Sequence, residues 1–245
     1  MLEIEHVTKR FGGLLAVNDL TLTVKKNQFL GVIGPNGAGK TTLLNVITGY
    51  YRPTSGKMTF GGERIDGKKP YEICRLGIAR TFQVVQPFPE MSVLDIAMTG
   101  ALFSRDGMTI RKARDTAMEA LEMVDIAHQA DVMAGALTLG AKKKLELARA
   151  LATRPRLLLL DEVMAGSPQS DIDELMKLLQ RIHANGVNIL MIEHLVHVII
   201  ALAQHVLVLN FGQELFQGKP DDVISHPDVI ESYLGKPLET LAEDA

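Results

Sequence analysis

Cysteine and tryptophan are almost missing from this 245-residue chain, which has one cysteine, Cys74, and no tryptophan. A single cysteine cannot form a disulfide within the chain, so we expect a reducing compartment. The most apolar stretch, "LVHVIIALAQHVLVL" at 195–209, is interrupted by His197, Gln204 and His205. It is shorter than the ~20 apolar residues that a membrane-spanning helix needs. Any membrane role is therefore expected to go through a partner chain.

An excess of positive charge is missing as well. The chain carries 26 lysines and arginines against 29 acidic residues, for a net charge of −3. Proteins whose main partner is nucleic acid are usually basic, so we expect no nucleic-acid partner. The N-terminal "MLEIEHVTKRF" contains acids and no apolar run, so no signal peptide is predicted. The length allows one large domain with a substantial core.

Two kinds of hydrophobic pattern divide the chain. Short β-type runs such as "LEIEHV" and "LTLTV" dominate the first sixty or so residues. The middle third looks helical, with Ser92 as a plausible cap and Ala117, Ala120, Leu121 and Val124 on one stripe. From 156 onward strands and helices alternate, which favours a parallel sheet with crossover helices. "NFGQELFQG" suggests a hairpin that turns at Gly212.

These patterns predict an α/β fold. We expect a single domain over 1–245, with a core made from about 1–84 and 156–235 and a helical lobe inserted at about 85–155. The core sheet should be mostly parallel, and an antiparallel β part should lie near the N-terminus. Residues 236–245 are an acidic tail.

A glycine-rich segment, "GPNGAGKT" at 34–41, matches the pattern G-x-x-x-x-G-K-[ST]. It follows an apolar strand and precedes a helix expected from Lys40 to about Tyr50. Glycines let successive N–H groups point inward at phosphate oxygens, and the helix N-terminus adds partial positive charge. Lys40 would reach the β- and γ-phosphates, and Thr41 would ligate Mg²⁺. The predicted nucleotide-binding residues are Gly34, Pro35, Asn36, Gly37, Ala38, Gly39, Lys40, Thr41 and Thr42.

An acidic pair follows a buried strand at "LLLLDE". Ligands of α/β sheets bind at the carboxyl ends of strands, where this pair is expected to lie. Asp161 suits a metal shell, and Glu162 suits the base that activates the attacking water. Taken alone, such a pair is more often a helix cap. Its place downstream of a phosphate-binding loop favours the catalytic interpretation.

The order of the motifs resembles one family. "GPNGAGKT", "RTFQ", "LELARAL", "LLLLDE" and "MIEH" follow one another. This order is similar to the ATP-binding subunits of ABC transporters over nearly the whole chain. Flanking segments such as "RFGGLLAVNDL" and "GIARTFQ" look like the ATPases of branched-chain (hydrophobic) amino-acid importers. The resemblance implies a P-loop NTPase core, ATP hydrolysis, and the cofactors ATP and Mg²⁺.

The resemblance also implies roles for single residues. Phe11 would stack on adenine beside Val17, Gln83 would reach Mg²⁺ and the attacking water, and His194 would contact the γ-phosphate. Glu162 with Gln83 and His194 then forms the catalytic set, and Thr41, Gln83 and Asp161 hold the metal. Without the resemblance, Phe11 is more typical of a core residue, Gln83 of a surface loop, and His194 of a structural histidine.

The same family forms head-to-tail dimers in which each nucleotide also meets the partner's signature helix. That helix usually begins Leu-Ser-Gly-Gly-Gln, and here the aligned residues are Leu137 to Ala141. Thr138, Leu139 and Gly140 would face the nucleotide of the second subunit. Lys142–Lys144 are expected on a solvated helix face. Val163 stands where the family usually has proline. In the loop that follows, Ser167-Pro168 stand where the family usually has an Asp or Asn, so the usual contact of this loop with the second subunit is not expected to be complete.

The expected function is that of the ATPase motor of an importer for branched-chain or other hydrophobic amino acids. Its partners would be membrane-spanning permease subunits and a second ATPase subunit, identical or different, at the cytoplasmic face of the inner membrane. Two alternatives stay open, namely the ATPase of a lipid or lipopolysaccharide exporter and a soluble ABC ATPase outside transport.

Overall fold

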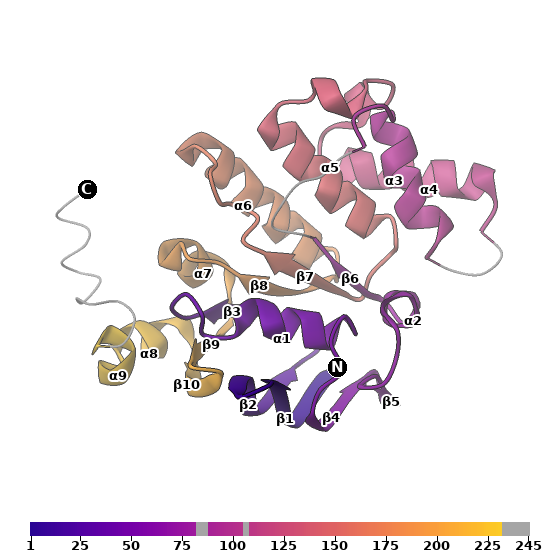
Figure 1. Ribbon diagram of the computed structural model, residues 1–245. Coiled ribbons are helices and arrows are strands. Elements are labelled where there is room, and N and C mark those ends of the chain that lie inside the picture. The colour runs from indigo at the N-terminus through magenta and orange to yellow at the C-terminus, as the bar shows by residue number, and fades with distance from the viewer. Residues whose placement is uncertain (82–87, 105–107, 232–245) are drawn as a thin grey trace. The chain divides into compact units, whose positions relative to one another are not determined.

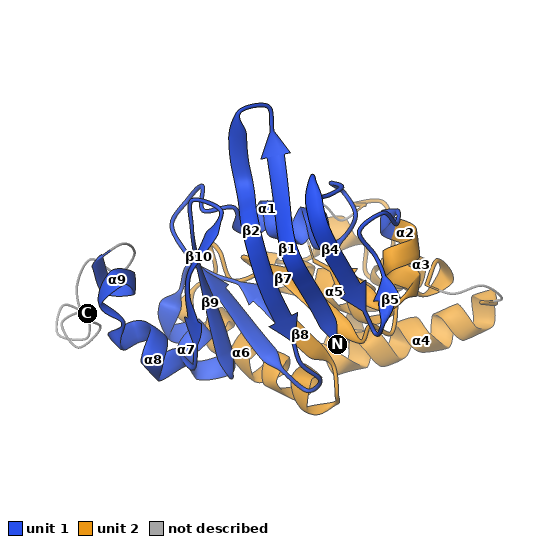
Figure 2. Ribbon diagram, turned by 90° about the horizontal axis from the view of Figure 1, so that it is seen from below, with its two compact units in different colours: residues 1–70, 190–245 blue, residues 71–189 orange. Residues whose placement is uncertain are grey.

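The structure is a computed structural model that describes residues 1–81, 88–104 and 108–231 (Figure 1). It forms two compact units (Figure 2). Unit 1 joins Met1–Pro70 to Leu190–Ala245, and unit 2 is Tyr71–Ile189. The core and lobe boundaries expected from the sequence stay predictions, and the tail at 236–245 lies outside the described residues.

An antiparallel sheet of four strands opens unit 1, in the order β2-β1-β4-β5. Its strands are β1 (Leu2–Phe11), β2 (Leu14–Val24), β4 (Ser55–Phe60) and β5 (Glu63–Arg64). Leu20, Leu22 and Val24 are buried while the residues between them are exposed, which is the alternation of a half-buried strand. The predicted antiparallel β part is confirmed.

The other strands of unit 1 carry the glycine-rich loop. β3 (Phe29–Ile33) is fully buried and runs parallel to β9 (His205–Asn210). β9 then pairs antiparallel with β10 (Gln213–Gly218), so the predicted hairpin at Gly212 is confirmed. The helices of this unit are α1 (Lys40–Ile47), α7 (Val196–Leu202), α8 (Pro220–Ser225) and α9 (Pro227–Val229).

Helix α1 is shorter than expected. The sequence predicts a helix to about Tyr50, but α1 ends at Ile47. The Thr48 hydroxyl donates to Leu44 O at 2.7 Å, and Gly49 adopts a left-handed φ of 75° that helical backbone does not allow.

Unit 2 combines a parallel strand pair with helices. β6 (Ile78–Arg80) runs parallel to β7 (Leu157–Asp161), with Arg80 opposite Leu159. β8 (Asn188–Ile192) is buried along its length and crosses from unit 2 into unit 1. The helices are α2 (Pro70–Arg75), α3 (Val93–Leu102), α4 (Ile110–Met123), η1 (Ala127–Gln129), η2 (Ala134–Ala136), α5 (Leu139–Leu151) and α6 (Gln169–Ala184).

Two features predicted for the helices of unit 2, an N-cap and a buried stripe, are present in the structure. Ser92 Oγ accepts from the Asp95 N–H at 3.0 Å, so Ser92 is the predicted N-cap of α3. Ala117, Ala120, Leu121 and Val124 are all buried, which confirms the predicted stripe. Among the described residues, none of the helices combines the length and the apolar character that crossing a membrane requires.

Candidate functional site

The glycine-rich loop joins β3 to α1, and its backbone leaves no room for side chains at two positions. Gly34 has φ 149°, and a Cβ there would lie 2.1 Å from Leu209 O. Gly39 has φ 97°, and its Cβ would lie 2.1 Å from Ala16 O. Glycine is therefore required at both ends of the loop by neighbouring backbone of unit 1. The loop between them is held curled, with the Ala38 N–H donating to Pro35 O at 3.2 Å.

The start of α1 suits an anion. Gly39 is its N-cap, and among the described residues no side chain caps the helix and no acid lies in its first turn. Its first N–H groups and the positive end of the helix dipole therefore face the loop. Lys40 is 5% exposed, and its Nζ donates to Gly34 O at 2.7 Å and Pro35 O at 3.1 Å. The lysine thus folds back over the loop that the sequence predicts to hold phosphates.

Phe11 has two neighbours that could not be expected from the sequence. Its ring meets that of Tyr51 edge to face at 5.0 Å, and Lys9 Nζ lies 4.8 Å from its centroid. Phe11 is 39% exposed, so it is available for stacking, whereas Val17 is buried in β2. Aromatic spacing along the sequence could not have paired Phe11 with Tyr51, because β1 and the segment after α1 meet only in the fold.

Asp161 is held by an arginine that the sequence prediction missed. Arg80 Nη2 donates to Asp161 Oδ2 at 2.7 Å, and both side chains are buried. Neighbouring parallel strands bring them together, since Arg80 ends β6 and Asp161 ends β7. A charged residue just before "TFQ" on a short strand was the available signal. The pair fixes the Asp161 carboxylate, because leaving either charge buried alone would cost several kcal/mol, on the order of 3–5.

Glu162 and His194 each follow the end of a buried strand. Glu162 comes directly after β7 with a left-handed φ of 51°. His194 is exposed two residues after the end of β8, and its N–H donates to Glu193 Oε2 at 3.3 Å. Unit 1 contains the phosphate loop and His194, while unit 2 contains Asp161 and Glu162. Gln83 lies outside the described residues.

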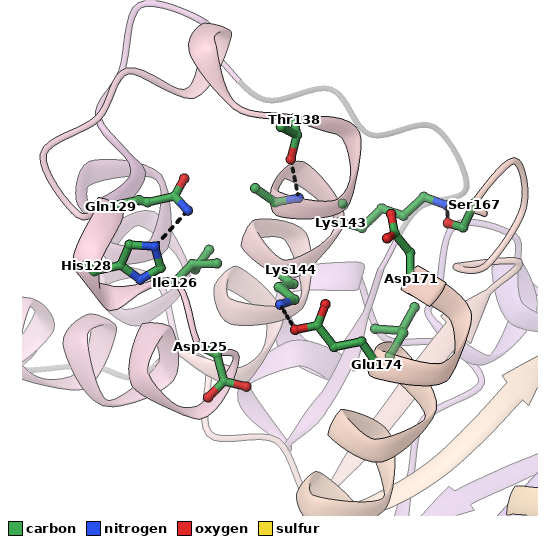
Figure 3. A pocket seen from close by; sticks show the side chains of 13 residues that line it. Asp125, Ile126, His128, Gln129, Thr138, Lys143, Lys144, Ser167, Asp171 and Glu174 are labelled. Carbon is green, nitrogen blue, oxygen red and sulfur yellow. Dashed lines mark hydrogen bonds and ion pairs between the residues drawn. The ribbon is translucent and has the colours of Figure 1, made fainter. Parts of the chain in front are cut away.

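The aligned signature residues start α5. Thr138 is the N-cap and accepts from the Ala141 N–H at 3.3 Å, while Leu139 is 52% exposed. A cavity of about 350 Å³ lies beside this turn, between α5, η1 and the first turns of α6 (Figure 3). Thr138, Gly140 and Asp171 are among its lining residues.

Two of the three lysines expected on a solvated helix face, Lys142–Lys144, also form bonds that the sequence did not indicate. Lys143 Nζ donates to Ala165 O at 2.6 Å, and Lys144 Nζ donates to Glu174 Oε1 at 2.7 Å. Both acceptors lie more than twenty residues further along the chain, so helical periodicity could not reveal them. The start of α5 is bonded to the loop and helix that follow β7.

The donor chemistry around the candidate metal ligands fits Mg²⁺ bound together with a phosphate substrate. Thr41 offers a hydroxyl and Asp161 a carboxylate, which are the hard oxygen donors that Mg²⁺ prefers. Among the described residues no group of three or more His, Cys, Asp or Glu could hold a metal ion by itself. Mg²⁺ usually binds through one or two carboxylates plus substrate phosphates, so this sparse set is the expected kind.

Residues 17–165 of the sequence match the ABC transporter family, a span that covers most of the chain and includes the phosphate loop and the acidic pair. The chain belongs to the ABC transporter family. It is 38% identical to the high-affinity branched-chain amino acid transport ATP-binding protein BraF of Pseudomonas aeruginosa, over 96% of this chain and 98% of that protein. It is 36% identical to LivG of Escherichia coli, which carries the same description, over 96% and 98% of the two chains.

The fold is that of an ABC ATPase cassette. The crystal structure of an ATP-binding cassette of an ABC transporter in its ADP conformation has a TM-score of 0.86 and 32% identity to this ABC protein. The similarity covers 96% of this chain and 99% of that one. The predicted α/β fold class and family membership are confirmed.

Proposed function

We propose that this ABC protein is the ATP-hydrolysing subunit of an importer for branched-chain or other hydrophobic amino acids. The observation that carries the proposal is the near full-length similarity to BraF and LivG, both described as branched-chain amino acid transport ATP-binding proteins. The phosphate loop would supply the chemistry that such a subunit needs, since Lys40 folds over the loop at the uncapped start of α1, where an anion would be stabilised.

The nucleotide would be held by unit 1. The N–H groups of the loop from Gly34 to Gly39 would cradle the phosphates, and the Lys40 ammonium would exchange its bonds to Gly34 O and Pro35 O for phosphate oxygens. Phe11 would stack on adenine beside Val17, which is buried in β2. Thr42, two residues after Lys40 in α1, would be the last of the nucleotide-binding residues.

Hydrolysis would use residues at the ends of strands. Glu162 would orient the attacking water and accept its proton, while His194 would donate to the γ-phosphate as negative charge builds on it. When bound, Mg²⁺ neutralises charge on the β- and γ-phosphates. Thr41, Asp161 and Gln83 are the residues that would hold the ion, and Arg80 keeps the Asp161 carboxylate in one orientation.

Assembly would place this chain against two kinds of partner. A second ATPase subunit, either another copy or a different chain, would receive Thr138, Leu139 and Gly140 at its nucleotide. Membrane-spanning permease subunits would hold the pair at the cytoplasmic face of the inner membrane. Co-purification of the chain with its membrane partners, followed by uptake assays with leucine, isoleucine and valine, tests both the partners and the solute.

The substitution Glu162→Gln tests the hydrolytic role. The amide keeps the shape of the side chain but cannot accept a proton, so ATP binding should persist while turnover falls by ~10²–10⁴-fold. Steady-state phosphate release and binding of a fluorescent ATP analogue are measured on the same preparation.

The control is Glu119→Gln, which neutralises an exposed carboxylate that pairs with Arg154 on the surface of unit 2. This variant should hydrolyse ATP like the wild type. Near-normal turnover by Glu162→Gln would remove Glu162 from the role of base, and a wild-type chain that neither binds nor hydrolyses ATP would refute the proposed function.

A further inference from the structure

Lys143 connects the start of α5, which the proposed function offers to the second ATPase subunit, with the loop that follows Glu162. From the second turn of α5 its Nζ donates to Ala165 O at 2.6 Å. It also donates to Ser167 Oγ at 2.7 Å (Figure 3). Ala165 and Ser167 belong to the loop that follows Glu162 and leads into α6. One ammonium group therefore binds both a carbonyl and a hydroxyl of the same short loop.

The outer end of the loop is exposed while its inner end is buried. Its first residues, Val163 and Met164, are buried at 8% and 1% exposure, but Ala165 and Gly166 are exposed. Its internal bonds include two turns, from the Ala165 N–H to Glu162 O at 3.2 Å and from the Ser167 N–H to Met164 O at 3.1 Å. Such turns are weak when water can reach them. The lysine adds charge-assisted bonds at the outer end of the loop.

The first turn of α5 also lies close to the start of α6. A Cβ at Gly140 would lie 3.2 Å from Asp171 Oδ2, so the helix start and the Asp171 carboxylate are near van der Waals contact. Thr138 and Gly140 lie at the N-terminal end of α5, within the same two turns as Lys143. A displacement of the loop would therefore change the surroundings of the residues that face the partner's nucleotide.

We propose that Lys143 is a positioning residue that makes the loop Ala165–Ser167 and the start of α5 one rigid surface. Glu162, at the inner end of the loop, and Thr138 to Gly140, at the helix start, then keep a fixed relation within unit 2. This role rests on the proposed function, because it matters for catalysis only if the chain hydrolyses ATP. Positioning errors of about 1 Å can cost on the order of 100-fold in rate.

The test is Lys143→Met in the full-length chain, since methionine keeps most of the aliphatic stem and removes the donor. We expect kcat for ATP to fall by on the order of 10-fold to 100-fold with KM changed less than about twofold, because Lys143 does not belong to the phosphate loop. Hydrogen exchange at the Ala165 and Ser167 amides should become faster without a matching loss of global stability.

Matched controls separate this role from a general effect of charge or packing. Lys144→Met removes the neighbouring lysine, which pairs with Glu174 and not with the loop, and should leave kcat and the loop amides near their wild-type values. Lys143→Arg should restore most of the rate. Ser167→Ala removes one of the two bonds without altering α5 and should give an intermediate loss, which keeps the test decisive if Lys143→Met fails to fold.

Two results would overturn the proposal, namely a Lys143→Met chain with wild-type kcat and loop exchange, or an equal loss of rate in Lys144→Met. A wild-type chain without ATPase activity would instead refute the proposed function. In that case, hydrogen exchange still decides whether Lys143 holds the loop, and the two failures stay distinguishable.

Discussion

Glu146 is a buried carboxylate in α5 whose environment opposes its charge. It is 4% exposed, and its Oε2 accepts from Arg149 Nη2 at 2.5 Å. Its Oε1 is buried and, among the described residues, has no hydrogen-bond partner. Burial raises the pKa of Glu146 above its ordinary value, and the nearby Arg149 charge opposes this rise only in part. The carboxyl group therefore makes the stability of the fold depend on pH.

The sign of this dependence follows from the raised pKa. The folded chain holds the Glu146 proton more tightly than the unfolded chain, so the stabilisation is complete below the unfolded pKa, near 4.5, and is lost as pH rises through the folded value. Glu146→Gln does not titrate. The variant should therefore gain stability relative to wild type as pH rises from about 4 and reach a plateau above the raised pKa.

Urea unfolding of both chains between pH 4 and pH 8 measures this difference. Glu119→Gln is the matched control, because its exposed pair with Arg154 should change the free energy of unfolding by no more than ~1 kcal/mol across the range. A Glu146→Gln curve parallel to that of wild type would contradict the interpretation.

At the scale of elements, the loop between β3 and α1 distinguishes two uses of glycine. Gly39 has both a left-handed φ of 97° and a neighbouring carbonyl, Ala16 O, only 2.1 Å from the site of a Cβ. Gly37 has a similar φ of 81° but nothing within 4 Å of its Cβ position. Backbone strain acts at both residues, whereas close approach of another strand acts only at Gly39.

The pair Gly39→Ala and Gly37→Ala separates these effects. Gly37→Ala should cost ~1–2 kcal/mol, the price of left-handed backbone with a Cβ. Gly39→Ala adds a clash with backbone that cannot move alone, so we expect a total of about 3 kcal/mol or more. Denaturant unfolding measures the loss of stability in both variants. Equal losses would show that the backbone at Ala16 moves away from the new Cβ at little cost.

At the scale of the whole molecule, an exposed apolar patch in unit 2 bears on assembly. Phe88 and Met133 are each 55% exposed and Val132 is 37% exposed. Their segments lie side by side, since the Gly135 N–H donates to Pro89 O at 3.2 Å and Ser92 pairs with Met133. Exposed apolar patches mark partner surfaces, and we propose that this one receives a cytoplasmic helix of the permease.

Phe88→Asp should uncouple the chain from its membrane partners and leave its own fold intact. A charge at the patch would have to be desolvated on docking, which costs several kcal/mol when unpaired, on the order of 2–5. Co-purification with the membrane subunits and thermal unfolding of the isolated chain measure the two effects. Phe211→Asp is the control, since Phe211 is 84% exposed on the β9–β10 turn of unit 1. Unchanged assembly of Phe88→Asp would place the docking surface elsewhere.

The sequence by itself determined the features that are local in the chain. The phosphate loop depends on glycines and a lysine within a few residues, and the caps and buried stripes depend on helical spacing. For the same reason the strand-and-helix alternation after 156 and the hairpin at Gly212 were predictable. Family membership followed from the order of such local motifs, because each is complete within a short segment.

Only the tertiary structure decided which distant side chains meet. Arg80 and Asp161 are 81 residues apart in sequence, and Lys143 is 22 residues from Ala165. The sequence around a lysine in an amphipathic helix does not indicate which distant carbonyl group the lysine will bind. The sequence therefore predicted only a solvated helix face for Lys142–Lys144. Parallel strands likewise place their ends together whatever lies between them in the chain. Helix and strand propensity and hydrophobic periodicity are set by residues close together in the sequence, whereas packing brings together residues that are far apart. For that reason the sequence did not predict the contacts of Arg80 and Lys143.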